Sequence, residues 1–63
     1  MSQVMYLRLD DGELVTRELD GVIWKKQGCW INFFRNGEYI GGYDLYKVIS
    51  IVIQDGDMIK PLY

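Results

Sequence analysis

The chain has 63 residues, with one cysteine, no histidine and a net charge of −2, and it predicts a single small domain spanning residues 1–63. This composition excludes an internal disulfide and a four-ligand zinc site within one chain, so self-association, as in a homodimer, remains as a source of added stability. The weak negative charge, with only Lys25 and Lys26 adjacent among the basic residues, disfavours non-specific nucleic-acid binding and mimicry of a polyanion.

Glycines divide the chain into short apolar segments, and no segment keeps a helical period over a useful length. The segments that have the length and composition of strands are residues 4–9, 14–19, 22–26, 29–35, 38–43, 46–53 and 58–60. This pattern predicts an all-β, antiparallel meander. We expect it to close into a small SH3-like or OB-like barrel, or to form a strongly curled sheet that pairs with a copy of itself.

The first hairpin has an ambiguous loop around Gly12. A three-residue loop with Gly12 in the left-handed region is preferred, and a four-residue loop that sets Leu9 against Leu14 is the alternative. The preferred loop groups on one face Met5, Leu7, Leu9, Val15, Arg17 and Leu19. That apolar face could cover one side of the hairpin in the middle of the chain.

The middle of the chain carries Asn36-Gly37 between two apolar segments, which is a strong signal for a hairpin with a type I′ turn. A two-residue loop places Arg35 opposite Glu38, and the same register continues outward. The further expected pairs are Phe34 with Tyr39, Phe33 with Ile40, Asn32 with Gly41, Ile31 with Gly42 and Trp30 with Tyr43. A preceding loop at Gln27-Gly28 would set Lys26 opposite Cys29 and Trp24 opposite Ile31.

The register divides these strands into two faces. One face is a normal core of Val22, Trp24, Ile31, Phe33 and Ile40. The other face is large and aromatic, and we predict that it binds a partner through Lys25, Trp30, Asn32, Phe34, Tyr39 and Tyr43. Two alternatives stay open: the aromatic residues are second-layer core under the first hairpin or a second subunit, or they stack bases or hold a small ligand. Lys25 would lie over Trp30 as a cation-π pair or cover the indole with its stem.

Toward the C-terminus, residues 48–53 are apolar on both faces, which is typical of a central strand or one that crosses the core. Pro61 follows near the end, where an edge strand tolerates it.

No group of residues predicts catalysis. The carboxylates around Gly12 and Gly56 lie in turn signals without the ligand spacing of a calcium loop. Without histidine, proton transfer near neutral pH lacks its usual agent, and Cys29 would have only Lys26 as a basic partner. We therefore expect a non-enzymatic protein with no cofactor and no metal site.

Three segments carry a resemblance that covers most of the chain: Leu-Asp-Asp-Gly-Glu, then Trp-Ile-Asn-Phe-Phe-Arg-Asn-Gly-Glu-Tyr-Ile-Gly-Gly-Tyr, then Val-Ile-Ser-Ile-Val-Ile. In this order the chain resembles very small all-β accessory proteins of phages and mobile elements. The resemblance implies a protein that binds and blocks a host or defence component, and it carries over no functional residue.

The expected function is therefore a protein-interaction module that blocks its partner sterically. One alternative is a single-stranded nucleic-acid binder of OB or Sm-like type, with Lys25, Lys26 and Arg35 near phosphates. The other is an oligomeric sponge for a small nucleotide, with its pocket between subunits. The amino-terminal residues lack the features of a signal peptide, and no apolar run has the length of a membrane span. We expect a cytoplasmic location.

Overall fold

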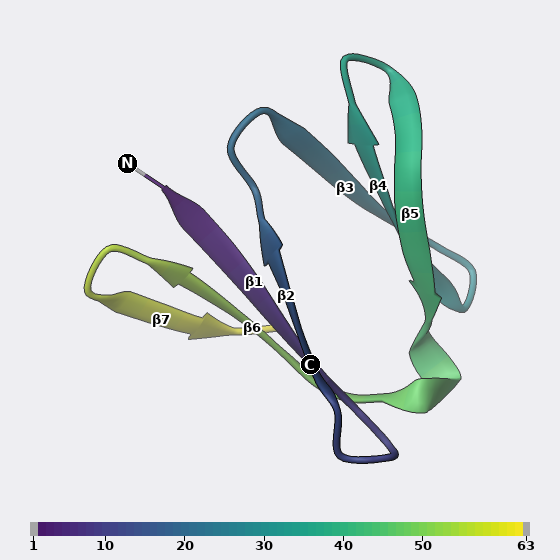
Figure 1. Ribbon diagram of the computed structural model, residues 1–63. Helices are drawn as coiled ribbons and strands as arrows, with labels where there is room; N and C mark the ends of the chain where they lie inside the picture. The colour runs from purple at the N-terminus through teal and green to yellow at the C-terminus, as the bar shows by residue number, and fades with distance from the viewer. Residues whose placement is uncertain (1, 63) are drawn as a thin grey trace.

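The computed structural model describes residues 2–62 and consists of two antiparallel sheets (Figure 1). The four-stranded sheet has the order β2-β1-β6-β7, and the three-stranded sheet has the order β3-β4-β5. The elements in chain order are β1 (Gln3–Leu9), β2 (Leu14–Glu18), β3 (Val22–Gln27), β4 (Trp30–Arg35), β5 (Glu38–Asp44), the 3₁₀ helix η1 (Leu45–Lys47), β6 (Val48–Asp55) and β7 (Met58–Pro61). The predicted all-β class and antiparallel arrangement are confirmed. The chain is not one continuous meander, because β2 and β3 lie in different sheets and β6 pairs with β1.

All seven predicted strands are present, and their ends agree with the prediction within two residues. One segment differs, because Tyr46 and Lys47 were expected to begin a strand and instead belong to η1. The carboxylate of Asp44 accepts a hydrogen bond from the Tyr46 N–H at 3.0 Å, which caps this short helix. Each strand ladder in residues 2–62 lies within one of the two sheets. Closure into a barrel therefore stays a prediction.

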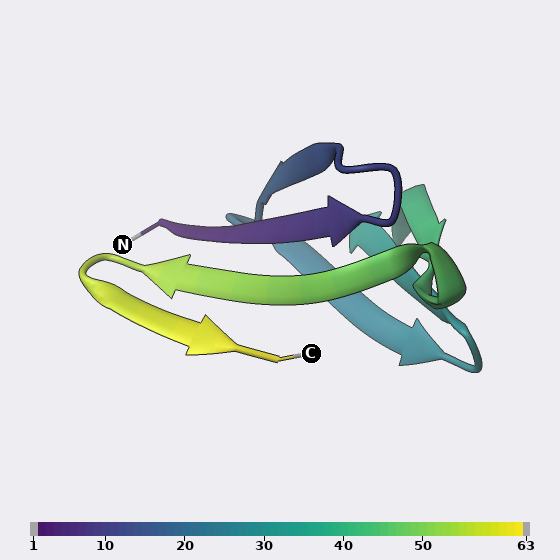
Figure 2. The same ribbon diagram turned by 90° about the horizontal axis from the view of Figure 1, so that it is seen from below.

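The first hairpin has the preferred three-residue loop. Leu7 lies opposite Val15 and Met5 opposite Arg17, while the Leu9 N–H donates to the Glu13 carbonyl at 2.8 Å. Gly12 has a φ of 91°, as a glycine at the end of such a loop requires. The hairpin continues into a larger sheet because β1 also pairs with β6, and Figure 2 shows β1, β6 and β7 running side by side.

The three-stranded sheet confirms the Asn36-Gly37 turn and corrects two registers. Asn36 and Gly37 both have positive φ, at 52° and 79°, as a type I′ turn demands. The loop between β3 and β4 is Gly28-Cys29 instead of Gln27-Gly28, so Trp24 lies opposite Phe33 and Lys26 opposite Ile31. This slip of two residues leaves every side chain of β3 on its predicted face, because strand side chains alternate with a period of two.

The second correction lies between β4 and β5, where a β-bulge leaves Ile40 without a partner. Phe34 pairs with Tyr39 as predicted, but Phe33 pairs with Gly41. Gly41 has a φ of 149°, a conformation that side chains disfavour, and this explains why the bulge occurs there. Beyond the bulge every pair is shifted by one residue, so that Tyr43 lies opposite Ile31 and not opposite Trp30.

The core lies between the two sheets and is small. The buried side chains among residues 2–62 are nine: Met5, Leu7, Leu19, Ile31, Phe33, Leu45, Val48, Ile51 and Ile53. Leu9, Val15, Val22, Trp24, Ile40 and Tyr43 pack against them while partly exposed. The described residues also include nine exposed large hydrophobic side chains. Most of these exposed groups are spread over the strands of both sheets.

β7 forms one edge of the four-stranded sheet, as expected for the segment before Pro61, and β2 forms the other. The Leu62 N–H donates to the Ile51 carbonyl at 2.8 Å. Main-chain N–H and C=O groups alternate in direction along an antiparallel ladder. Those of Lys60 and Met58 therefore also face β6, while the main-chain groups of Ile59 and Pro61 face the open side of the strand. Proline has no N–H, so Pro61 interrupts the row of donors along this edge.

Candidate functional site

The outer face of the three-stranded sheet forms a regular grid of side chains, which we call the aromatic face. Each strand contributes alternate residues, and the register places them in three rows across β3, β4 and β5. The rows are Ile23-Phe34-Tyr39, Lys25-Asn32-Gly42 and Gln27-Trp30-Asp44. Three large members are exposed, with Ile23 at 63%, Tyr39 at 57% and Trp30 at 47% of their accessible surface.

The first row is apolar and is held by ring contacts. The rings of Phe34 and Tyr39 meet edge to face, with their centroids 5.8 Å apart and their planes at 66°. This geometry aligns the positive edge of one ring with the negative face of the other. The Lys25 Nζ lies 5.6 Å from the centroid of the Phe34 ring. Lys25 was expected over Trp30, as a cation-π pair or as a stem covering the indole, and its aromatic partner is instead Phe34.

The middle row ends at Gly42, and neighbouring atoms fill the space that a side chain would take there. A Cβ placed on Gly42 would lie 2.5 Å from Asn32 Oδ1, 2.8 Å from the Tyr39 hydroxyl and 2.9 Å from the Ile31 carbonyl oxygen. Tyr39 and Asn32 thus both lie against the glycine backbone. Asn32 also donates from Nδ2 to Gln27 Oε1 at 2.8 Å, which holds its amide on the face.

Five of the six residues predicted for this site share the aromatic face, and Tyr43 does not. The bulge at Ile40 turns Tyr43 to the inner face, where it packs against the core. Its ring meets the Phe33 ring edge to face, with centroids 6.3 Å apart. Ile23 also lies on this face. Sequence reasoning missed the packing of Tyr39 and Asn32 against Gly42, for which the Gly41-Gly42 pair was the available signal.

The charges around the aromatic face are few. Lys25 lies on it, while Lys26 alternates to the inner face and lines a cleft between the sheets. The Arg35 side chain lies on the same face of the sheet as Ile31 and Phe33, which is the inner face. The Asp44 carboxylate at the corner of the grid is engaged in capping η1. The three cations expected beside stacked bases are therefore divided between the two faces of the sheet.

The first acidic turn and the Cys29 loop take part in hydrogen bonds that support the fold. The Asp11 carboxylate accepts a hydrogen bond from the Glu13 N–H at 2.9 Å, which stabilises the first loop. Cys29 is exposed in the β3–β4 loop, and its carbonyl accepts from the Leu45 N–H at 2.7 Å. Among residues 2–62 no group of three or more histidine, cysteine or acidic residues is placed to hold a metal ion.

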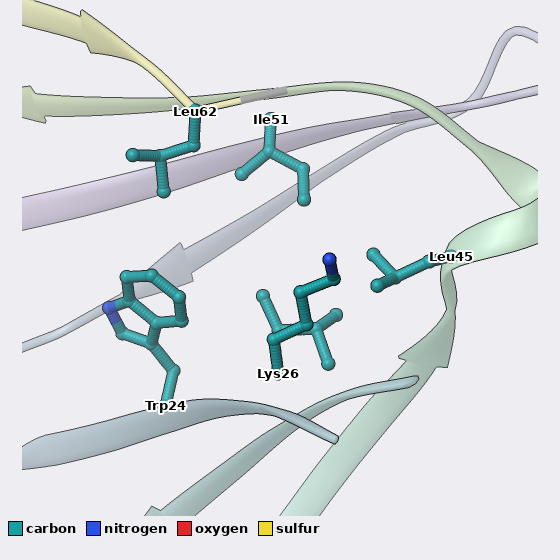
Figure 3. Close-up of a pocket in the computed structure, with 6 residues that line it drawn as sticks. Trp24, Lys26, Leu45, Ile51 and Leu62 are labelled. Carbon is teal, nitrogen blue, oxygen red and sulfur yellow. The ribbon is translucent and has the colours of Figure 1, made fainter. Parts of the chain in front are cut away.

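A second feature, the cleft, lies at the open side of the core between the two sheets (Figure 3). It has a volume of about 220 Å³. Its lining residues are Trp24, Lys26, Ile31, Leu45, Ile51 and Leu62. Figure 3 shows Trp24 and Lys26 rising from β3 toward Leu62 and Ile51. Sequence reasoning missed the cleft because its walls come from five separate segments.

Comparison of the chain with known protein families, with curated proteins and with solved structures finds no match to any of them. In the described part of the chain, no helix combines the length and apolar character that crossing a membrane requires.

Proposed function

We propose that the protein is a non-enzymatic interaction module that binds another protein through the aromatic face and blocks it sterically. The observation that carries this proposal is the gathering of Ile23, Tyr39 and Trp30, all about half exposed or more, on one sheet face. Tryptophan and tyrosine are the residues most enriched at the energetic centres of protein interfaces, and monomers seldom expose such groups together.

The charge distribution favours a protein partner over a nucleic acid. A surface that follows phosphates needs several cations beside its aromatic groups. Among the residues that form the aromatic face, Lys25 is the single cation. The polar members of the middle row, Asn32 and Lys25, offer hydrogen-bond donors of the kind that fix orientation at a protein interface. Single-stranded nucleic-acid binding and an oligomeric nucleotide sponge remain alternatives without a specific observation in their favour.

The wider setting of the proposal follows from the sequence. An accessory inhibitor of the phage type is the kind of protein that the resemblance implies, and the cytoplasm is its expected location. The meander β3-β4-β5, followed by η1 and then by β6, which pairs with β1, is compatible with the predicted SH3-like barrel. A homodimer would cover part of the exposed apolar surface and add the stability that so small a core lacks.

The test is affinity capture from nuclease-treated lysate of the cell in which the chain is expressed naturally. The baits are the wild type, Trp30→Ala, Tyr39→Ala and a matched control, Tyr46→Ala. Tyr46 is 83% exposed but lies in η1, outside the aromatic face. We expect one stoichiometric protein that is lost with Trp30→Ala or Tyr39→Ala, because truncating an interface anchor costs about 2 kcal/mol or more.

The control variant should retain that protein, and the purified partner should lose its activity in proportion to added wild-type chain. Retention of the partner by the Trp30 and Tyr39 variants would refute binding through this face. Circular dichroism of each bait establishes that the substituted chains are folded, since a bait that unfolds would lose its partner for another reason.

A further inference from the structure

One edge of the three-stranded sheet has main-chain groups that find no hydrogen-bond partner among residues 2–62. β3 is an edge strand, with β4 as its neighbour on one side. The Val22 N–H donates to the Leu19 carbonyl at 3.0 Å and therefore points away from β4. Because main-chain groups alternate in an antiparallel ladder, those of Trp24 and Lys26 also point to the open side. Such groups form a template for an added strand.

The cleft adjoins the same two residues. The side chains of Trp24 and Lys26 lie on the inner face of the sheet and line the cleft together with Leu62 and Ile51 of the other sheet (Figure 3). Residues directly opposite each other on neighbouring strands share a face. Side chains of an added strand that lie opposite Trp24 and Lys26 would therefore enter the cleft.

We propose that the β3 edge binds an extended peptide segment of a partner protein by strand addition. A large apolar side chain of that segment occupies the cleft opposite Trp24, and an aspartate or glutamate two residues away pairs with Lys26. Main-chain hydrogen bonds supply affinity in this mode of recognition, and the pockets for alternate side chains supply specificity. This site is distinct from the aromatic face and does not depend on the function proposed for that face.

The charges support an acidic segment. Lys26 lines both the cleft and a second hollow beside Gly28 and Tyr46, and the residues described around these two hollows include no carboxylate. Lysine and a carboxylate directly opposite on neighbouring strands attract each other. Pairing of two β3 edges from two copies is disfavoured, because each edge brings the adjacent cations Lys25 and Lys26.

Of the three other edge strands, β2 contributes no residue to the cleft, and β7 and β5 are less suited to strand addition. Pro61 removes a donor from the edge of β7, and the bulge at Ile40 interrupts the regular edge of β5. The β3 edge has neither interruption, and its ladder with β4 is regular along its length. Its regularity lets successive residues of a bound segment keep the two-residue spacing that the proposal requires.

A display library of randomised nine-residue peptides tests the proposal, selected separately on the wild type, Lys26→Glu and Lys47→Glu. Lys47 is exposed in η1, so its variant carries the same charge change outside the β3 edge. We expect peptides selected on the wild type and on Lys47→Glu to share a large apolar residue and an acidic residue two positions apart. Lys26→Glu should bind them about tenfold more weakly or worse and should select a basic residue in place of the acid.

The absence of a shared pattern, or an acidic preference that survives in Lys26→Glu, would overturn the proposal. NMR of the wild-type chain with one selected peptide then locates the site, because the two tryptophans lie in different places. We expect slower hydrogen exchange at the Trp24 and Lys26 amides and a shifted Trp24 indole signal. A shift of the Trp30 indole alone would place the peptide on the aromatic face and would also overturn strand addition at β3.

Discussion

Phe33 and Phe34 are adjacent in β4 and lie on opposite faces of the sheet. Their neighbours are of the same kinds, but Phe33 is buried and Phe34 is partly exposed. Phe33 is fully buried, with the Tyr43 ring against it edge to face and the Arg17 guanidinium 4.9 Å from its centroid. Phe34 is partly exposed, with Tyr39 in the same relation and the Lys25 ammonium 5.6 Å away. Each phenylalanine thus contacts one tyrosine and one cation, and only the inner set is covered by the second sheet.

The difference shows that packing between sheets, and not the local ring contacts, decides which set supports the fold. Arg17 illustrates the constraint inside: its Nε is buried without a hydrogen-bond partner in the described residues, and its Nη2 lies 3.2 Å from the position that a Cβ of Gly41 would occupy. The outer set meets water instead, so its members remain free to contact a partner.

The largest expected effect is the loss of the inner ring. Phe33→Ala should lower the free energy of unfolding by about 3–5 kcal/mol, because it leaves a cavity in the core. A domain of 63 residues has a total stability of roughly 3–9 kcal/mol at about 0.05–0.15 kcal/mol per residue, so this variant should lose about a third of that stability or more. Phe34→Ala should cost only about 1 kcal/mol.

Urea denaturation followed by tryptophan fluorescence measures both values. Equal losses for the two variants would mean that the aromatic face is covered in solution, for example by a second copy of the chain. A dependence of the midpoint on protein concentration would then identify that copy as the cover.

Substitution of Gly42 or Gly41 should lower the stability by a smaller amount, and the two variants should differ in their effect on the aromatic face. Gly42→Ala should cost about 1–3 kcal/mol, since the new methyl group would meet the fixed Ile31 carbonyl as well as the Tyr39 and Asn32 side chains. It should also displace the Tyr39 ring and weaken partner binding. Gly41→Ala should cost a similar amount through its φ of 149° but leave the aromatic face unchanged.

NMR of the aromatic rings distinguishes the two variants. Gly42→Ala should shift the Tyr39 signals and Gly41→Ala those of Phe33. The opposite pattern would contradict the bulge at Ile40, because without it the two glycines would exchange faces.

The smallest effect is the outer cation-π contact. A double-mutant cycle with Lys25→Met and Phe34→Leu should give a coupling of about 0.5 kcal/mol, as expected for an exposed pair. The corresponding cycle with Arg17→Met and Phe33→Leu should give a larger value, about 1–2 kcal/mol, because burial removes competing water. A larger coupling in the outer pair would show that Lys25 and Phe34 are shielded from solvent.

Local signals were sufficient to predict much of this fold. The strand boundaries followed from glycine-containing turns, and Asn36-Gly37 set the β4–β5 turn and the Phe34–Tyr39 pair. The β3–β4 loop was misplaced by one residue, which slipped the pairing by two, but every side chain stayed on its predicted face. The bulge at Ile40 had the opposite effect, because a shift of one residue turned Tyr43 to the inner side.

The remaining features depend on contacts distant in the sequence. Asp44 before Leu45-Tyr46-Lys47 was a local sign of η1, but three residues show no helical period. The cleft joins Trp24 to Leu62 and Ile51, which only the packing of one sheet on the other brings together. Pairing of neighbouring strands can be derived from turn chemistry, whereas the way two sheets meet depends on the whole core.

The pairing of β1 with β6 also sets the order in which the chain can fold. Residues 3–9 pair with residues 48–55, so this ladder requires closure of a loop that includes both hairpins between them. A hairpin with a type I′ turn forms within about 1–10 μs, while contacts this far apart in sequence belong to folding times of milliseconds to seconds. During synthesis β1 cannot pair with β6 until β6 has left the ribosome. The three-stranded meander is therefore complete earlier than the sheet that covers its inner face.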